Sequence, residues 1–287
     1  MLSQTLVNGI ATGLVTALPA LALTLVFGVM RFANFAIGAT LTFGAYAAYY
    51  FNVGLGLPLF VSAVISAAIT AALCVLVNRL VYQNLPGASG ITLLVASMGV
   101  AFLLENFVRF IYGNSVRGYQ IQAVRPWRLL DLRISQEQIV NIAVALGCLA
   151  LIWLLLYRTS MGRAMRAVAD NPSLAAARGI RPARVISGTF ALSGALTGLA
   201  GVLIGVDGAV EPLSGYNYII PVFAAAILGG IGDPVGAVVG ALVLGVVEEM
   251  SSLVLPSTYR SGIAFVVMAV VLMVRPWGLF GTEPIKK

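Results

Sequence analysis

Six arginines gather between Arg158 and Arg184, in a chain of which only 9% of the residues are charged. They stand in the stretch YRTSMGRAMRAVADNPSLAAARGIRPAR with a single acid, Asp170. Guanidinium groups bind carboxylates, phosphates and lipid headgroups. The cluster therefore indicates either a basic loop that only fixes the topology of a membrane protein or a surface that docks a partner.

The same stretch predicts two short helices joined by a turn. The first carries Arg163 and Arg166, three residues apart on one face. Asn171 fits the N-cap of the second helix, Pro172 its first turn and Gly179 its C-terminal end. This helix–turn–helix is typical of a docking element. We predict that docking depends on Arg163, Arg166, Asp170, Asn171, Ala175 and Gly179.

Several kinds of chemistry are excluded by what the chain lacks. It contains no histidine, and its only lysines are Lys286 and Lys287. A GxxxxGK[ST] phosphate-binding loop is therefore impossible, as are HExxH and Cys/His metal sites. Cys74 and Cys148 stand within apolar runs, where we expect them to pack. We expect no enzyme activity, no cofactor and no metal site.

Acidic groups within apolar runs are few, and Glu105, Glu248 and Glu249 are the main candidates. An ion-coupled carrier needs ionisable groups of this kind in its core. Glu105, however, stands four residues before Arg109, a spacing typical of an ion pair on one helix. These residues keep one class of function open: an ion-coupled secondary transporter, or a channel that acts without an ATPase.

The composition places all these residues in a membrane protein. The mean hydropathy is +1.00, and 60% of the residues are hydrophobic. A soluble domain needs about 25% charged residues to cover its surface. The net charge of +7 therefore indicates basic loops beside membrane lipid, not a nucleic-acid partner.

Apolar runs long enough to cross a bilayer, about 20 residues, follow one another along the chain. They lie at about 5–29, 34–52, 57–80, 89–112, 137–157, 185–206, 219–230, 235–255 and 260–274. We predict an all-α, polytopic helical bundle of about eight transmembrane helices, formed by residues 1–287 as a single domain. The short run at 219–230 either crosses the membrane or turns back within it, and both alternatives stay open. No basic residue precedes the first run, so we expect that run to be a retained span and not a cleaved signal.

The orientation follows from the basic residues of the loops. With the loop at 158–184 in the cytoplasm, eleven arginines and lysines fall inside and six fall outside. This balance predicts an N-terminus outside the cell and a cytoplasmic C-terminus.

A glycine-rich break divides the last long apolar run. Proline and clustered glycine in GGIGDP stop the helix between Gly229 and Pro234. The second half of a broken helix presents free N–H groups that suit a carboxylate. A pathway lining and a tight cytoplasmic turn both remain open. The pathway candidates of this run are Gly229, Gly230, Gly232, Asp233 and Gly236.

Four stretches carry a resemblance to a known family. YRTSMGRAMRAVADNPSLAAARGI resembles the cytoplasmic loop of ABC importer permeases of the branched-chain amino-acid type. MRFANFAIGATLTFGAYAA looks like their second span, with Asn34 and Gly38 matching and Ile37 where His or Gln is frequent. AAILGGIGDPVGAVVGALVLGVVEE and the closing RPWGLFG are also similar to stretches of these permeases. The resemblance is to the H-type subunit of the family.

The resemblance implies a permease that works by alternating access, with its coupling helix in the loop at 158–184. It adds Asn34 and Gly38 to the expected substrate pathway. The implied partners are a homologous second permease subunit, two ABC ATPase subunits and a periplasmic or extracellular solute-binding protein, in the bacterial plasma (inner) membrane. Branched-chain amino acids are the implied solutes, and urea, short amides and aromatic acids stay open.

Overall fold

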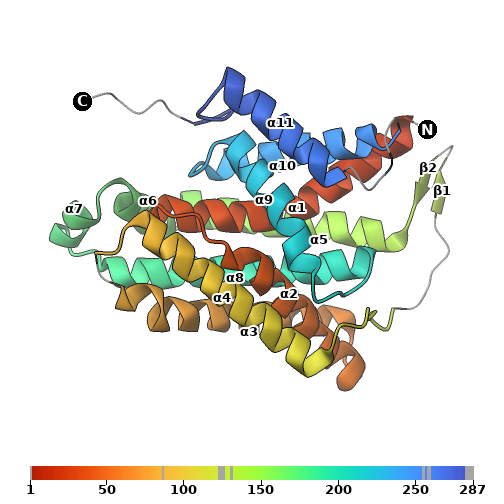
Figure 1. Cartoon of the computed structure of the whole chain (residues 1–287), viewed down its shortest axis with the longest axis horizontal. Coiled ribbons are helices and arrows are strands. Elements are labelled where there is room, and N and C mark those ends of the chain that lie inside the picture. The colour runs from red at the N-terminus through yellow and green to blue at the C-terminus, as the bar shows by residue number, and fades with distance from the viewer. Residues whose placement is uncertain are drawn as a thin grey trace.

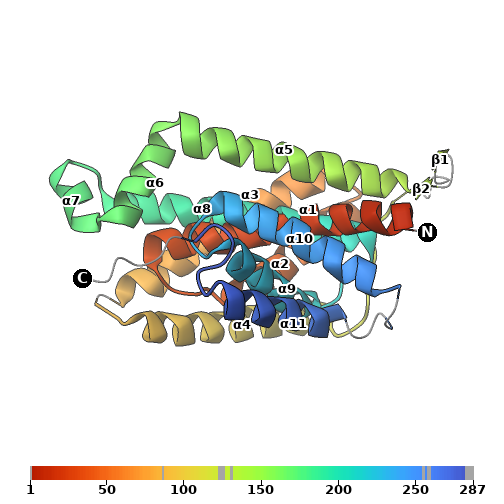
Figure 2. The same cartoon turned by 90° about the horizontal axis from the view of Figure 1, so that it is seen from above.

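The computed structural model describes residues 2–85, 87–121, 127–129, 132–253, 256 and 260–281. Helices dominate it (Figures 1 and 2). They are α1 (Leu2–Met30), α2 (Ala36–Tyr49), α3 (Leu59–Leu80), α4 (Gly90–Tyr112), α5 (Gln136–Arg158), α6 (Ser160–Asp170), α7 (Pro172–Ala177), α8 (Pro182–Asp207), α9 (Ser214–Gly229), α10 (Pro234–Ser251) and α11 (Arg260–Val274). A π-helical turn (Tyr50–Gly54) follows α2, and a 3₁₀ turn (Tyr82–Asn84) follows α3. The prediction of an all-α membrane bundle is confirmed.

In the part of the chain that the structure describes, β structure is limited to a short antiparallel hairpin and one isolated bridge between Arg117 and Val210. The hairpin pairs β1 (Trp127–Leu129) with β2 (Leu132–Ile134) in the long loop before α5. Arg125 and Asp131 of that loop, and the C-terminal Lys286 and Lys287, lie outside the described residues.

Six of the described helices are long and apolar enough to cross a membrane: α1, α3 with its 3₁₀ turn, α4, α5, α8 and α10. The predicted count of about eight is therefore approximate, because α2, α9 and α11 are shorter. Proline and glycine explain the predicted break near 229–236: α9 ends at Gly229, and α10 begins at Pro234.

The centre of the bundle is formed by α1 and α8, which are buried along most of their length, whereas α3, α4 and α5 lie at the periphery. Small residues let the inner helices approach closely. A Cβ on Gly13 would lie 2.9 Å from the carbonyl oxygen of Ala241 in α10. One on Gly194 would lie 2.6 Å from that of Thr70 in α3. These two glycines are thus points of close contact between helices.

One end of the bundle carries α6 and α7, which follow α5 and lead into α8 (Figures 1 and 2). We call it the α7 end. The C-terminus of α1 and the turn between α9 and α10 meet α6 there around one cavity. The hairpin of β1 and β2 and the start of α1 lie at the opposite end.

Candidate functional site

Local capping chemistry forms the segment of α6 and α7. The Thr159 hydroxyl accepts a hydrogen bond from the backbone N–H of Gly162 at 3.3 Å. The Asn171 side chain accepts one from the N–H of Leu174 at 3.0 Å. Pro172 is the first residue of α7. Gly179 follows α7 with φ +84°, which glycine adopts readily. The predicted helix–turn–helix is confirmed, with Asn171, Pro172 and Gly179 in the expected places.

The inner face of α6 packs against the end of α5. Met165 and Val168 are buried in the same apolar cluster as Leu156. Gly162 lies so close to the backbone of Leu156 that a Cβ there would overlap its carbonyl group. Ala175 is the buried residue of α7. The segment is therefore packed against α5 through α6 and is not a loose basic loop.

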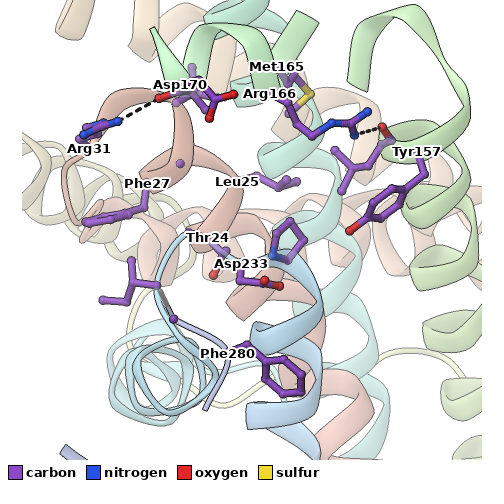
Figure 3. A pocket seen from close by; sticks show the side chains of 18 residues that line it. Thr24, Leu25, Phe27, Arg31, Tyr157, Met165, Arg166, Asp170, Asp233 and Phe280 are labelled. Atoms are coloured by element: carbon purple, nitrogen blue, oxygen red, sulfur yellow. Dashed lines mark hydrogen bonds between the residues drawn. The ribbon is translucent and has the colours of Figure 1, made fainter. Parts of the chain in front are cut away.

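The two arginines predicted to dock a partner differ in their contacts. Arg166 donates a hydrogen bond to the carbonyl oxygen of Leu156 at 2.5 Å, and its guanidinium lies 5.4 Å from the centre of the Tyr157 ring (Figure 3). Arg163 is exposed, and no ion pair or hydrogen bond of its side chain occurs among the described residues. Arg166 thus attaches α6 to α5, and Arg163 faces outward.

The short helix α7 projects past the ends of the neighbouring helices (Figures 1 and 2). Its side chains are exposed except for Ala175, and Leu174 is 57% exposed at the tip. Leu174 is therefore the large apolar side chain that α7 leaves exposed. The sequence reasoning did not select Leu174; its position in the first turn after an Asn-Pro cap was the available signal.

The turn between α9 and α10 lies at the α7 end. The Asp233 carboxylate accepts hydrogen bonds from the N–H groups of Val235 at 2.8 Å and Gly236 at 2.9 Å. Gly229 and Gly236 lie in direct backbone contact, where a Cβ on either would overlap the other. The N–H groups at the start of α10 are therefore already bound by Asp233.

The residues after α11 complete this turn. The N–H of Leu279 donates to the carbonyl oxygen of Leu228 at 2.9 Å, and that of Phe280 to Gly229 at 3.0 Å. These carbonyls belong to the last turn of α9 and have no partner within that helix. A Cβ on Gly230 would lie 2.6 Å from the N atom of Gly281. The stretch RPWGLFG is thus a cap for α9.

A cavity of about 720 Å³ lies between α6, the end of α1, the α9–α10 turn and the capping segment (Figure 3). Its charged lining is Arg31, Arg166, Asp170 and Asp233. The cavity joins two predicted docking residues, Arg166 and Asp170, with Gly232 and Asp233 from the predicted pathway. Arg163 and the residues of α7 lie outside it.

Asn34 and Gly38 are placed elsewhere, at the start of α2. The buried Asn34 side chain accepts hydrogen bonds from the N–H of Ala36 at 3.1 Å and the Tyr82 hydroxyl at 3.3 Å. A Cβ on Gly38 would lie 2.5 Å from the carbonyl oxygen of Gly215 in α9. Both residues therefore hold α2 against its neighbours, and neither lines the cavity.

Glu105 forms the ion pair that its spacing predicts. Its carboxylate lies 2.7 Å from the guanidinium of Arg109, one turn later on α4. The contact neutralises a charge within an apolar helix.

Comparison with known proteins gives this architecture a family. Residues 5–272 match the sequence model of the family described as branched-chain amino acid transport system / permease component. The chain belongs to this family. It is therefore a multi-pass transport permease and not itself an enzyme.

The similar relatives match the permease over nearly its whole length. It is 30% identical to the high-affinity branched-chain amino acid transport system permease protein LivH of Escherichia coli K12, across 99% of this chain and 97% of that one. It is 31% identical to BraD of Pseudomonas aeruginosa, with the same coverage. A LivH described as a probable branched-chain amino acid permease of Methanocaldococcus jannaschii is 30% identical, across 92% of this chain and 88% of that one.

A solved structure shares the fold of the permease. It is an inward-facing conformation of a transporter assigned to the metal-chelate ABC type, with a TM-score of 0.52 and 17% identity. The match covers 95% of this chain and 85% of that one.

Proposed function

We propose that this permease is the membrane subunit of an ATP-driven ABC importer that moves branched-chain or related amino acids across the bacterial plasma membrane. The projecting segment of α6 and α7 is the observation that carries the proposal. It presents Leu174 and Arg163 outward from a helix that is fixed to α5. The relatives named as branched-chain amino acid permeases support the solute class.

ATP is hydrolysed on separate chains in this proposal. The only lysines are at positions 286 and 287, so the chain has no GK[ST] phosphate-binding loop of its own. The complex contains two ATPase subunits, and one of them binds the coupling loop at 158–184 of this permease. A force on α7 passes through α6 to α5 and α8, because these helices are contiguous with the segment. The permease alternates between outward-open and inward-open states as ATP is bound and hydrolysed.

The remaining subunits are a homologous second permease and a solute-binding protein outside the membrane. The α7 end faces the cytoplasm, with the N-terminus outside and the C-terminus inside. Residues 1–287 form a single permease domain. We place the pathway near Asn34, Gly38 and the α9–α10 turn, whose members are Gly229, Gly230, Gly232, Asp233 and Gly236.

Reconstitution tests the proposal. The permease is purified with its second subunit and candidate ATPases, and ATP turnover and uptake of radiolabelled leucine are measured in proteoliposomes that contain the binding protein. We expect uptake that requires ATP. Uptake that proceeds unchanged without the ATPases would establish the alternative, an ion-coupled carrier or a channel. The ion pair of Glu105 with Arg109 speaks against Glu105 as the coupling group of such a carrier.

A further inference from the structure

Arg31 has a backbone conformation that residues with a side chain rarely adopt. Its φ is +55°, and it is the only non-glycine residue with positive φ in the described part of the chain. Its N–H donates to the carbonyl oxygen of Phe27 at 2.7 Å, so it closes the last turn of α1. Glycine usually fills this position, because a Cβ crowds the following carbonyl in the left-handed region. A compensating contact is therefore expected.

The side chain of Arg31 makes that contact. Its guanidinium donates a hydrogen bond of 3.1 Å to the carbonyl oxygen of Ala169, 138 residues later in the sequence (Figure 3). Ala169 lies in the last turn of α6, where carbonyl groups have no partner within the helix. A cation is favourable there because it faces the negative end of the helix dipole. The left-handed turn thus directs a charged donor onto the end of α6.

The end of α1 also lies beside the α9–α10 turn. A Cβ on Gly232 would lie 4.0 Å from the Phe27 ring, and one on Gly28 would lie 3.9 Å from the carbonyl oxygen of Gly232. Further along, α1 packs closely on α10 through Gly9 and Gly13. A displacement of α6 that pulls on Arg31 therefore reaches a central helix and the turn next to it.

We propose that Arg31 is a positioning residue that ties α6 and α7 (residues 160–177), the coupling segment, to α1. It transmits the movement of α6 to the centre of the bundle, in addition to the covalent route through α5 and α8. The transmitting role rests on the proposed function, because it requires an ATPase to move α6. The tie itself does not.

The first arm of the test measures the tie in the purified permease. Asparagine tolerates the left-handed region and removes the guanidinium, so Arg31→Asn should fold. Hydrogen–deuterium exchange of residues 160–170 should become about fivefold faster, as expected when a charged hydrogen bond is lost. Exchange in α8 should not change. Arg79→Asn is the matched control, because exposed Arg79 lies in the last turn of α3. It removes the same charge and should leave α6 as it is.

The second arm measures coupling in the reconstituted importer. Arg31→Asn should lower the solute imported per ATP hydrolysed by about fivefold, within the usual range of coupling between sites. Arg31→Lys should restore most of the ratio, since it returns a cation to the end of α6. Arg31→Gly relieves the backbone conformation without the cation; it should fold at least as well as the wild type and still be uncoupled.

Each result has a defined meaning. Unchanged exchange in α6 for both Arg31→Asn and Arg31→Gly would overturn the tie. Faster exchange with an unchanged transport ratio would overturn the transmitting role. If the wild type shows no ATP-dependent uptake at all, the proposed function fails and the transmitting role with it, while the exchange measurement still decides the tie.

Discussion

The Arg166 guanidinium donates a 2.5 Å hydrogen bond to the carbonyl oxygen of Leu156, across the junction of α5 and α6. Arg163 is one turn earlier on the same helix; both side chains are exposed, but no hydrogen bond or ion pair of the Arg163 side chain occurs among the described residues. Two arginines that stand three residues apart on one helix therefore make different contacts. Arg166 fixes α6 to α5, and the Arg163 side chain projects from α6 without such a contact.

This difference predicts unequal losses of stability for two similar substitutions. Arg166→Ala should lower the free energy of unfolding by about 1–2 kcal/mol, because it leaves the Leu156 carbonyl without its charged donor. Arg163→Ala should stay within about 0.5 kcal/mol of the wild type, as is usual for an exposed side chain that makes no hydrogen bond or ion pair with the described residues. Thermal unfolding in detergent measures both. Equal losses of stability would contradict this difference.

Gly162 should tolerate no side chain. Gly162→Ala places a Cβ onto the backbone of Leu156, and such overpacking typically destabilises by about 1–3 kcal/mol. Gly147→Ala is the matched control on α5, where an added Cβ meets no atom within 4 Å. We expect the control to be neutral or slightly stabilised. The ranking is measured as melting temperature, and a control that melts as early as Gly162→Ala would contradict the account.

Two substitutions of Asp233, the N-cap of α10, distinguish its structural role from a contact with the solute. Asp233→Ala should destabilise by about 1 kcal/mol, because α10 loses its N-cap, whereas Asp233→Asn should keep the stability of the wild type. Asparagine retains the cap and loses the charge. Leucine uptake by Asp233→Asn therefore reports the charge alone. If Asp233→Asn melted at a temperature as low as that of Asp233→Ala, the capping role would be contradicted.

The proposed orientation of the permease in the membrane predicts which introduced cysteines a membrane-impermeant reagent can label in intact cells. In a background with Cys74→Ala and Cys148→Ala, Val116→Cys and Ser173→Cys place single thiols on exposed positions at opposite ends of the bundle. A membrane-impermeant maleimide should label Val116→Cys in intact cells and Ser173→Cys only after permeabilisation. The reverse pattern would show that the α7 end faces outward.

Features set by neighbouring residues could be predicted from the sequence. Asn171, Pro172 and Gly179 define α7 because a cap, a first-turn proline and a left-handed residue each act within one helical turn. The pair of Glu105 and Arg109 is local in the same way. Apolar runs located the long helices because a membrane span has a minimum length.

Features that depend on tertiary packing could not be predicted. The bond from Arg31 to Ala169 joins residues 138 positions apart. The helix α9 begins at Ser214, five residues before the predicted span. Next to this start, the N–H of Gly215 donates a hydrogen bond of 2.8 Å to the Thr42 hydroxyl. The place of the GGIGDP turn at the α7 end follows from how α9 and α10 pack on α1. No local pattern specifies these contacts.

In the proposed function an ATPase subunit binds α7, and crosslinking tests this contact most directly. A benzoylphenylalanine photocrosslinker replaces Leu174 at the tip of α7 or, as the control, Phe110, which is 90% exposed in the last turn of α4 toward the opposite end. The assembled complex is irradiated, and adducts are identified by mass spectrometry. We predict an adduct with the ATPase subunit from position 174 and none from position 110. No ATPase adduct from position 174 in an assembled, ATP-hydrolysing complex would contradict the account.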